Sequence, residues 1–113
     1  MKKIEAIVRQ ERIGAVRKAL VETGHRSMIN HDVWYRGTEN EISQHQADGI
    51  TPMYDFMSKV KIELIVNDES VQDVIDAISD SAHTGHVGDG KIFVMPVEEA
   101  IRIQTKETGD IVI

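Results

Sequence analysis

Residues 60–66 read Val60-Lys61-Ile62-Glu63-Leu64-Ile65-Val66, and residues 67–82 carry Asn67-Asp68 followed by Val71, Val74, Ile75, Ile78 and Ala82. The first segment alternates well enough to predict a strand, and Asn67-Asp68 supplies turn and helix-capping chemistry. The later apolar residues recur at helical spacing. This part of the chain therefore predicts a strand that leads directly into an amphipathic helix.

The same order of elements is predicted at the start of the chain. Ile4–Arg9 is rich in branched residues and predicts a strand. Ile13, Val16 and Leu20 then fall on one helical face, and Gly24 is suited to end that helix. A further strand is expected over about Met28 to Tyr35.

The second half closes with another strand over Ile92–Met95 and a short one over Ile101–Ile103. Between the halves, Arg36 to about Met53 has no sustained period and predicts a long loop. The order βαβ, long loop, βαβ predicts one α+β domain of ferredoxin-like fold over residues 1–113. Its strands carry apolar residues at both odd- and even-numbered positions, which point to opposite faces of the sheet. The face without helices is therefore expected to be apolar and covered by a neighbouring subunit.

Composition limits the classes of function. The chain has 113 residues, no cysteine and a net charge of -6. This acidic balance argues against a broad nucleic-acid surface, and the absence of cysteine excludes disulfides and thiolate chemistry. No stretch is apolar enough to predict membrane insertion, and the first residues lack a secretory core, so a cytoplasmic protein is expected.

The run Thr84–Lys91 contains three glycines and ends in a lysine. Gly85–Lys91 matches the opening of a Walker A motif, but Ile92 stands where that motif needs Ser or Thr, and the run leads into a strand instead of a helix. A P-loop is therefore rejected. Converging N–H groups and Lys91 still suit an anion, while a simple glycine turn before an edge strand explains the spacing equally well.

A resemblance decides between these alternatives. Thr84–Val97 resembles the C-terminal signature of the PII signal-transduction family, whose bacterial members are GlnB/GlnK-like, and Met1–Ile7, Asp55–Glu63 and Ile101–Thr105 resemble it too. The match runs in order over nearly the whole chain except the long loop. It implies a homotrimer that binds ATP or ADP in the clefts between subunits and is not an enzyme. It also implies a T-loop over about residues 36–57, a B-loop over 84–91 and a C-terminal loop and tail over about 102–113.

The resemblance also implies roles for single residues. The nucleotide site is expected to comprise Ile7, Ile29, Gly37, Thr38, Glu39, Lys59, Glu63, Ile65, Gly88, Asp89, Gly90, Lys91, Arg102 and Gln104. Ile65 would flank the adenine, Arg102 would bind phosphate, and Gln104 replaces a second phosphate-binding arginine. The protein target would be an ammonium transporter, another transporter or a metabolic enzyme. The T-loop residues expected to contact it are Ile50, Pro52, Met53, Tyr54 and Met57.

The T-loop is where the chain departs from the family. Glu39 stands where the family has a glutamine that coordinates magnesium, and it could itself hold Mg²⁺ beside ATP. Its carboxylate would repel 2-oxoglutarate, so weak binding or none is expected although Lys59, the family's carboxylate-pairing lysine, is retained. Thr38 replaces an arginine and Pro52 the modified tyrosine, unless Tyr35-Arg36-Gly37 shifts the register.

Two other classes of function stay open. A trimeric ferredoxin-like metal-binding protein of the CutA type would share the architecture, and a small phosphate-cleaving enzyme would use Lys91 and Arg102 catalytically. His83 and His86 have a spacing that can hold a metal but lack a third ligand nearby in sequence. Trp34 and Tyr35 favour an aromatic pair at a sheet edge.

Overall fold

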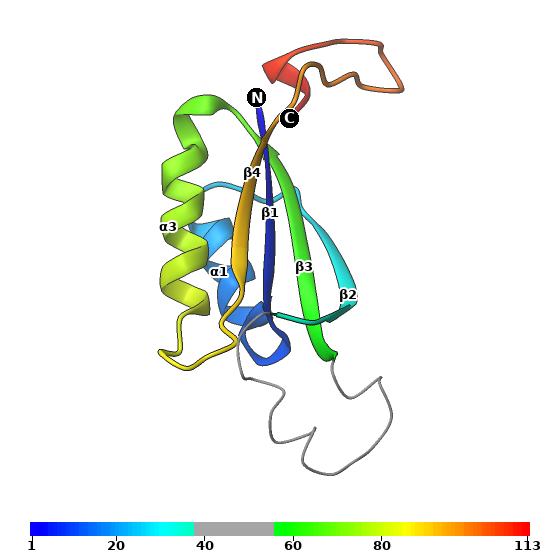
Figure 1. The fold of residues 1–113 in the computed structure, drawn as a ribbon. Helices are drawn as coiled ribbons and strands as arrows, with labels where there is room; N and C mark the ends of the chain where they lie inside the picture. The colour runs from blue at the N-terminus through cyan, green and yellow to red at the C-terminus, as the bar shows by residue number, and fades with distance from the viewer. Residues whose placement is uncertain (38–55) are drawn as a thin grey trace.

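The computed structural model describes residues 1–37 and 56–113, which form a four-stranded antiparallel sheet with two α-helices (Figure 1). The strands are β1 (Lys2–Arg9), β2 (Ile29–Tyr35), β3 (Met57–Val66) and β4 (Lys91–Pro96), in the order β2-β3-β1-β4. The helices are α1 (Ile13–Glu22) and α3 (Val71–Ala82), with short 3-10 turns at Gln10–Arg12, Asp68–Ser70 and Asp110–Val112. In each half of the chain a helix connects two strands, β1 to β2 and β3 to β4, which confirms the ferredoxin-like α+β fold predicted from the sequence.

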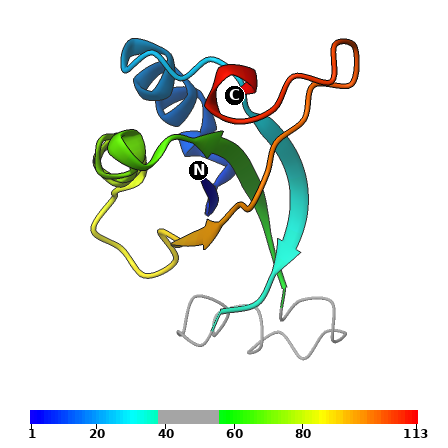
Figure 2. The same ribbon diagram turned by 90° about the horizontal axis from the view of Figure 1, so that it is seen from above.

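The core lies between the sheet and the helices, which cover the same face (Figure 2). On β1 and β3 the even-numbered apolar residues, from Ile4 to Val8 and from Val60 to Val66, are buried, and they pair across the strands, for example Ala6 with Ile62. From the helices, Val16, Leu20, Val74 and Ile78 complete the same cluster. The period of two in the strands and of about four in the helices thus directs the apolar side chains into one layer.

The ends of the helices follow the signals in the sequence. Gly24 has a φ of 92°, and its N–H donates to Val21 O while His25 N–H donates to Leu20 O. This pair of bonds is a Schellman motif, which ends α1 at a residue where glycine is favoured. Before α3, the Asn67 side chain accepts a hydrogen bond from Ser70 N–H at 3.0 Å. Both predicted helix boundaries are confirmed.

The face of the sheet opposite the helices has charge at its centre. Lys3, Glu5, Lys61 and Glu63 approach one another there, with Nζ–carboxylate distances from 3.3 to 4.0 Å. Burial would raise the pKa of Glu63, but hydrogen bonds from Lys3 and Lys61 hold it below its ordinary value. Apolar residues such as Phe93, which is 47% exposed, occupy the flanks. The expectation of an apolar second face is therefore right for the flanks and wrong for the centre.

The C-terminal part contains less strand than the sequence suggests. Ile101–Ile103 is not a strand, because only an isolated bridge joins Ile101 to Thr108. Met57, expected at the end of the T-loop, is the first residue of β3 and pairs with Tyr35. Within the described residues, no helix has the length and apolar character needed to cross a bilayer.

We expect Ile62→Ala to lower the free energy of unfolding by roughly 2–5 kcal/mol, because it removes a side chain with no exposed surface from the centre of the core. Val21→Ala is the matched control, since Val21 is 41% exposed on α1, and it should change stability by less than about 0.5 kcal/mol. Urea unfolding at equal protein concentration measures both values. Equal effects of the two substitutions would contradict this placement of the core.

Candidate functional site

The glycine-rich loop Thr84–Gly90 joins α3 to β4 at the end of the sheet where β1 finishes and β3 begins (Figure 1). Gly85, Gly88 and Gly90 have φ values of 86°, 102° and 108°, a region that favours glycine. At Gly90 the packing adds a second requirement, because a Cβ atom there would lie 1.7 Å from Ile7 O. The backbone of the loop is thus pressed directly against β1, and only glycine allows this approach.

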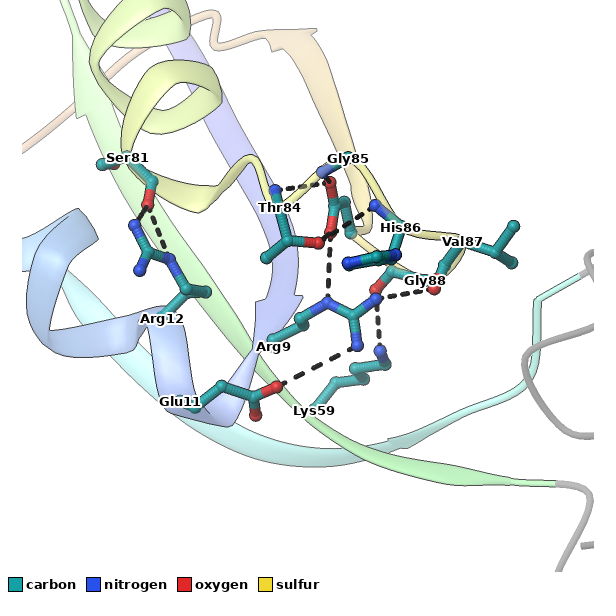
Figure 3. A network of polar contacts seen from close by, with 11 residues as sticks. Arg9, Glu11, Arg12, Lys59, Ser81, Thr84, Gly85, His86, Val87 and Gly88 are labelled. Atoms are coloured by element: carbon teal, nitrogen blue, oxygen red, sulfur yellow. Dashed lines mark hydrogen bonds and ion pairs between the residues drawn. The ribbon is translucent and has the colours of Figure 1, made fainter. Parts of the chain in front are cut away.

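A network of polar contacts holds the loop in shape (Figure 3). Arg9, at the end of β1, donates from Nε to Asp89 Oδ1 at 3.1 Å and from a terminal nitrogen to Val87 O at 2.6 Å. The Asp89 carboxylate also accepts from the N–H of Thr84 at 2.8 Å, from the N–H of Gly85 at 3.1 Å and from the Thr84 hydroxyl. The two ends of the loop are therefore tied to each other and to β1.

These donors determine the charge state of Asp89. Burial would raise the pKa of its carboxyl, but the hydrogen bonds from Thr84, Arg9 and Gly85 outweigh burial and hold the pKa well below its usual range. Asp89 is consequently ionised at every pH at which the protein would function. Its negative charge is compensated by the Arg9 guanidinium at the end of β1.

Lys59 supports the loop from β3. Its side chain is almost completely buried, at 2% exposure, and Nζ donates to Gly88 O at 2.8 Å. Lys59 lies opposite Arg9 in the register between β1 and β3. Two neighbouring cations therefore bind consecutive carbonyl groups of the loop, those of Val87 and Gly88.

The turn after β1 ties the same end of the sheet to α3 and β3. Arg12 donates from two nitrogens to Ser81 O, at 2.9 and 2.5 Å, in the last turn of α3. A cation at this position also interacts favourably with the negative end of the helix dipole. Gln10 donates to Ser58 Oγ at 2.8 Å. Through this turn, the last turn of α3, which precedes the glycine-rich loop, is connected to the first residues of β3.

A cleft of about 410 Å³ opens beside the loop, between α3 and β4. Its apolar wall includes Ile7, Ile78 and Ile92, and Asp89, Gly90 and Lys91 line the side next to the loop. Lys91 is exposed and forms no ion pair with any residue in 1–37 or 56–113. The volume lies within the usual range for small-molecule sites, and the cation at its margin suits an anionic ligand.

A second set of the expected residues extends from the centre of the sheet toward its opposite end. Ile29, Glu63 and Ile65 line a hollow of about 440 Å³ together with residues of the C-terminal segment, including Ile101. Arg102 donates to Glu107 at 2.9 Å and to Ile111 O at 3.2 Å, and Gln104 is exposed. Within this chain, the segment that carries Arg102 and Gln104 therefore lies at the end of the sheet away from Lys91 and the glycine-rich loop (Figure 1).

The expected site residues are thus distributed along the length of the sheet in this chain. Ile7, Lys59 and Gly88–Lys91 lie together at the end near the glycine-rich loop, and Gly37 is half-buried after β2. Outside the described residues lie Thr38, Glu39, Ile50, Pro52, Met53 and Tyr54. His83 and His86 belong to no group of three or more potential metal ligands among the described residues.

Sequence reasoning missed Arg9. Its side chain reaches Asp89, a partner 80 residues away along the chain, so no local pattern could reveal the contact. The only signal was a cation at the end of a buried strand, opposite another cation, Lys59, in the register. That signal becomes interpretable only once the strands are paired.

The fold and the site together define a small α+β protein with a glycine-rich loop built against the central strand of a ferredoxin-like sheet. Comparison with known proteins identifies the family. A family model described as Nitrogen regulatory protein P-II matches residues 1–107. The chain belongs to this family, and it is a regulatory signal-transduction protein of the GlnB/GlnK-like kind.

Several relatives resemble the chain over nearly its whole length. Nitrogen regulatory protein P-II of Azospirillum brasilense is 41% identical, covering 96% of both chains. Nitrogen regulatory protein GlnK2 of Haloferax mediterranei is 42% identical, covering 96% of this chain and 88% of the relative. Among solved structures, Arabidopsis thaliana PII bound to citrate superposes with a TM-score of 0.77 at 38% identity, covering 96% of this chain and 85% of that one.

We expect Gly90→Ala to displace the loop from β1 and to destabilise the protein by roughly 1–3 kcal/mol, because the added Cβ meets Ile7 O and φ is positive. Gly14→Ala is the matched control, since nothing lies within 4 Å of the Cβ it adds on α1, and it should be neutral or stabilising by up to about 1 kcal/mol. Urea unfolding measures both, and NMR shifts of the loop amides report the displacement. A neutral Gly90→Ala would contradict the close approach.

Proposed function

We propose that this protein binds ATP and ADP in clefts between subunits and regulates a partner protein through the segment that joins β2 to β3. The observation that carries the proposal is the preorganised glycine-rich loop, which ends at Lys91, a cation without an ion pair among the described residues. A folded loop of this kind binds an anion without a large loss of conformational entropy. Lys91 would then supply the charge-assisted contact to phosphate.

The residues at this end of the sheet fit a nucleotide. Gly88, Gly90 and Lys91 would hold phosphates, and the apolar wall that includes Ile7 would contact the uncharged part of the ligand. The carbonyl groups of Val87 and Gly88, which would repel an anion, are already bound by Arg9 and Lys59. Magnesium at Glu39 and weak binding of 2-oxoglutarate remain part of the proposal, although Glu39 lies outside the described residues.

The separation of the two sets of residues supports a site between subunits. Arg102 and Gln104 belong to the C-terminal segment, at the end of the sheet opposite Lys91 and the glycine-rich loop (Figure 1). Ile29, Glu63 and Ile65 line a hollow beside that segment, whereas Lys91 lines the cleft beside the loop. A neighbouring subunit could bring its own copies of these residues to the cleft. The mixed face of the sheet opposite the helices offers the surface for such contact, because apolar residues flank its charged centre.

Partner control is proposed to depend on the T-loop. The strand that follows it, β3, is fixed near the glycine-rich loop at its start, since Lys59 binds Gly88 O and Gln10 binds Ser58. A nucleotide that contacts the glycine-rich loop would therefore also act on the start of β3. Ile50, Pro52, Met53, Tyr54 and Met57 are the residues proposed to meet a transporter or a metabolic enzyme in nitrogen metabolism.

We expect the protein to be a trimer, with a mass by light scattering of three times the chain mass of 12.7 kDa. Phe93→Asp should shift it toward the monomer, because this half-exposed residue lies on the sheet face without helices. Val21→Asp places the same charge on the exposed side of α1 and should leave the trimer intact. A stable wild-type monomer at micromolar concentration would remove the intersubunit site.

We expect ATP and ADP to compete for one site per subunit, and Lys91→Ala to weaken both about tenfold to a hundredfold through loss of a charge-assisted contact. Lys18→Ala removes an equal charge from the surface of α1, where Lys18 pairs with Glu22 at 3.9 Å, and should leave both affinities unchanged. Isothermal titration calorimetry measures the affinities. No heat of binding with wild-type protein would refute the proposed function.

A further inference from the structure

Asp89 presents an electrostatic problem for a loop that binds phosphates. A carboxylate about 4 Å from a phosphate oxygen repels it by up to about 4 kcal/mol at an effective dielectric near 20. The sequence places this carboxylate between Gly88 and Gly90, two residues before Lys91. Either Asp89 opposes ligand binding, or its side chain has a different task.

The Asp89 carboxylate binds donors of the protein itself. Both carboxylate oxygens accept hydrogen bonds from within the protein, and the four donors are Arg9 Nε, the N–H groups of Thr84 and Gly85, and the Thr84 hydroxyl. Arg9 then extends the network to Val87 O, and the Thr84 hydroxyl oxygen accepts from His86 N–H at 3.2 Å. The carboxylate is therefore the centre around which the loop is folded (Figure 3).

We propose that Asp89 and Arg9 are positioning residues that form a clasp, which folds the glycine-rich loop before ligand arrives, and that Asp89 does not itself contact the phosphates. This inference rests on the proposed function and differs from the expectation, drawn from the resemblance, that Asp89 belongs to the ligand contacts. Arg9 compensates the charge of Asp89, so the charge of Lys91 stays available to the ligand. Because the loop is already ordered, binding does not have to supply the free energy of ordering it.

The proposal and simple repulsion predict opposite changes in ATP affinity when the charge of Asp89 is removed. Asp89→Asn keeps the size of the side chain but removes its charge. If Asp89 repelled phosphate, this variant would bind ATP more tightly. In the clasp, an amide offers only one acceptor oxygen, and its NH₂ group faces N–H donors at the other position. The loop then loses charge-assisted hydrogen bonds, and we expect ATP affinity to fall about tenfold or more.

A second measurement distinguishes a positioning role from a direct contact. Amide exchange by NMR, in the absence of nucleotide, reports the order of the loop at Thr84 and Gly85, whose N–H groups donate to Asp89. We expect both amides to exchange at least about tenfold faster in Asp89→Asn, as the loss of such a bond implies. Asp73→Asn removes the same charge from the exposed surface of α3 and should change neither exchange nor affinity.

The partner residue supplies an independent variant. Arg9→Gln should also accelerate exchange at Thr84 and Gly85 and weaken ATP, because it removes the bonds to Asp89 and Val87. If the two residues act as one unit, the double variant Arg9→Gln/Asp89→Asn should bind ATP little more weakly than either single variant. Independent, additive losses would overturn the clasp.

The outcomes separate the clasp from the proposed function. Tighter or unchanged ATP binding by Asp89→Asn overturns the proposal, and so does weaker binding with unchanged amide exchange, which would make Asp89 a direct ligand contact. If wild-type protein binds no ATP, the proposed function fails, while faster exchange in Asp89→Asn still supports the clasp. If exchange is also unchanged, both fail.

Discussion

Burial of the even-numbered side chains of β1 and β3 beneath α1 and α3 is the constraint on which the other parts of the structure depend. Because side chains alternate along a strand, a shift of one residue would move the whole apolar set to the other face, so the register is strongly fixed. That register places Arg9 opposite Lys59 and Ile7 opposite Lys91. The end of β1, the start of β3 and the start of β4 consequently meet at one end of the sheet, where the glycine-rich loop is attached.

The electrostatics of that end follow from this placement. Arg9 and Lys59 lie at odd-numbered positions and bind the carbonyl groups of Val87 and Gly88. Each bond satisfies an acceptor whose negative dipole end would otherwise face an approaching anion. Gly90 allows the loop to come close enough for these contacts, because a side chain there would meet Ile7 O. The core register, the glycine and the two cations therefore belong to one arrangement.

Local patterns in the sequence predicted the parts of this fold that local physics determines. The alternation in residues 60–66, the helical spacing after Asn67 and the stop at Gly24 each depend on neighbours within a few residues. The charged centre of the sheet face opposite the helices was not predicted, because it depends on contacts between adjacent strands, such as that of Lys3 on β1 with Glu63 on β3. Ile101–Ile103 has strand-like composition but finds only an isolated bridge, as the segment turns back on itself through the bonds between Arg102, Lys106 and Glu107.

Arg102, which is paired within its own chain, could still serve the site that we propose between subunits. Its ion pair with Glu107 is short, but the two side chains are 43% and 40% exposed, so solvent screens their attraction. Exchanging Glu107 for a phosphate oxygen would replace one charge-assisted hydrogen bond by another of similar kind, at little net cost. Glu63 differs, because it is held by Lys3 and Lys61 with only 15% of its side chain exposed. In the proposed site Arg102 is therefore the residue able to change partners, and Glu63 is the fixed one.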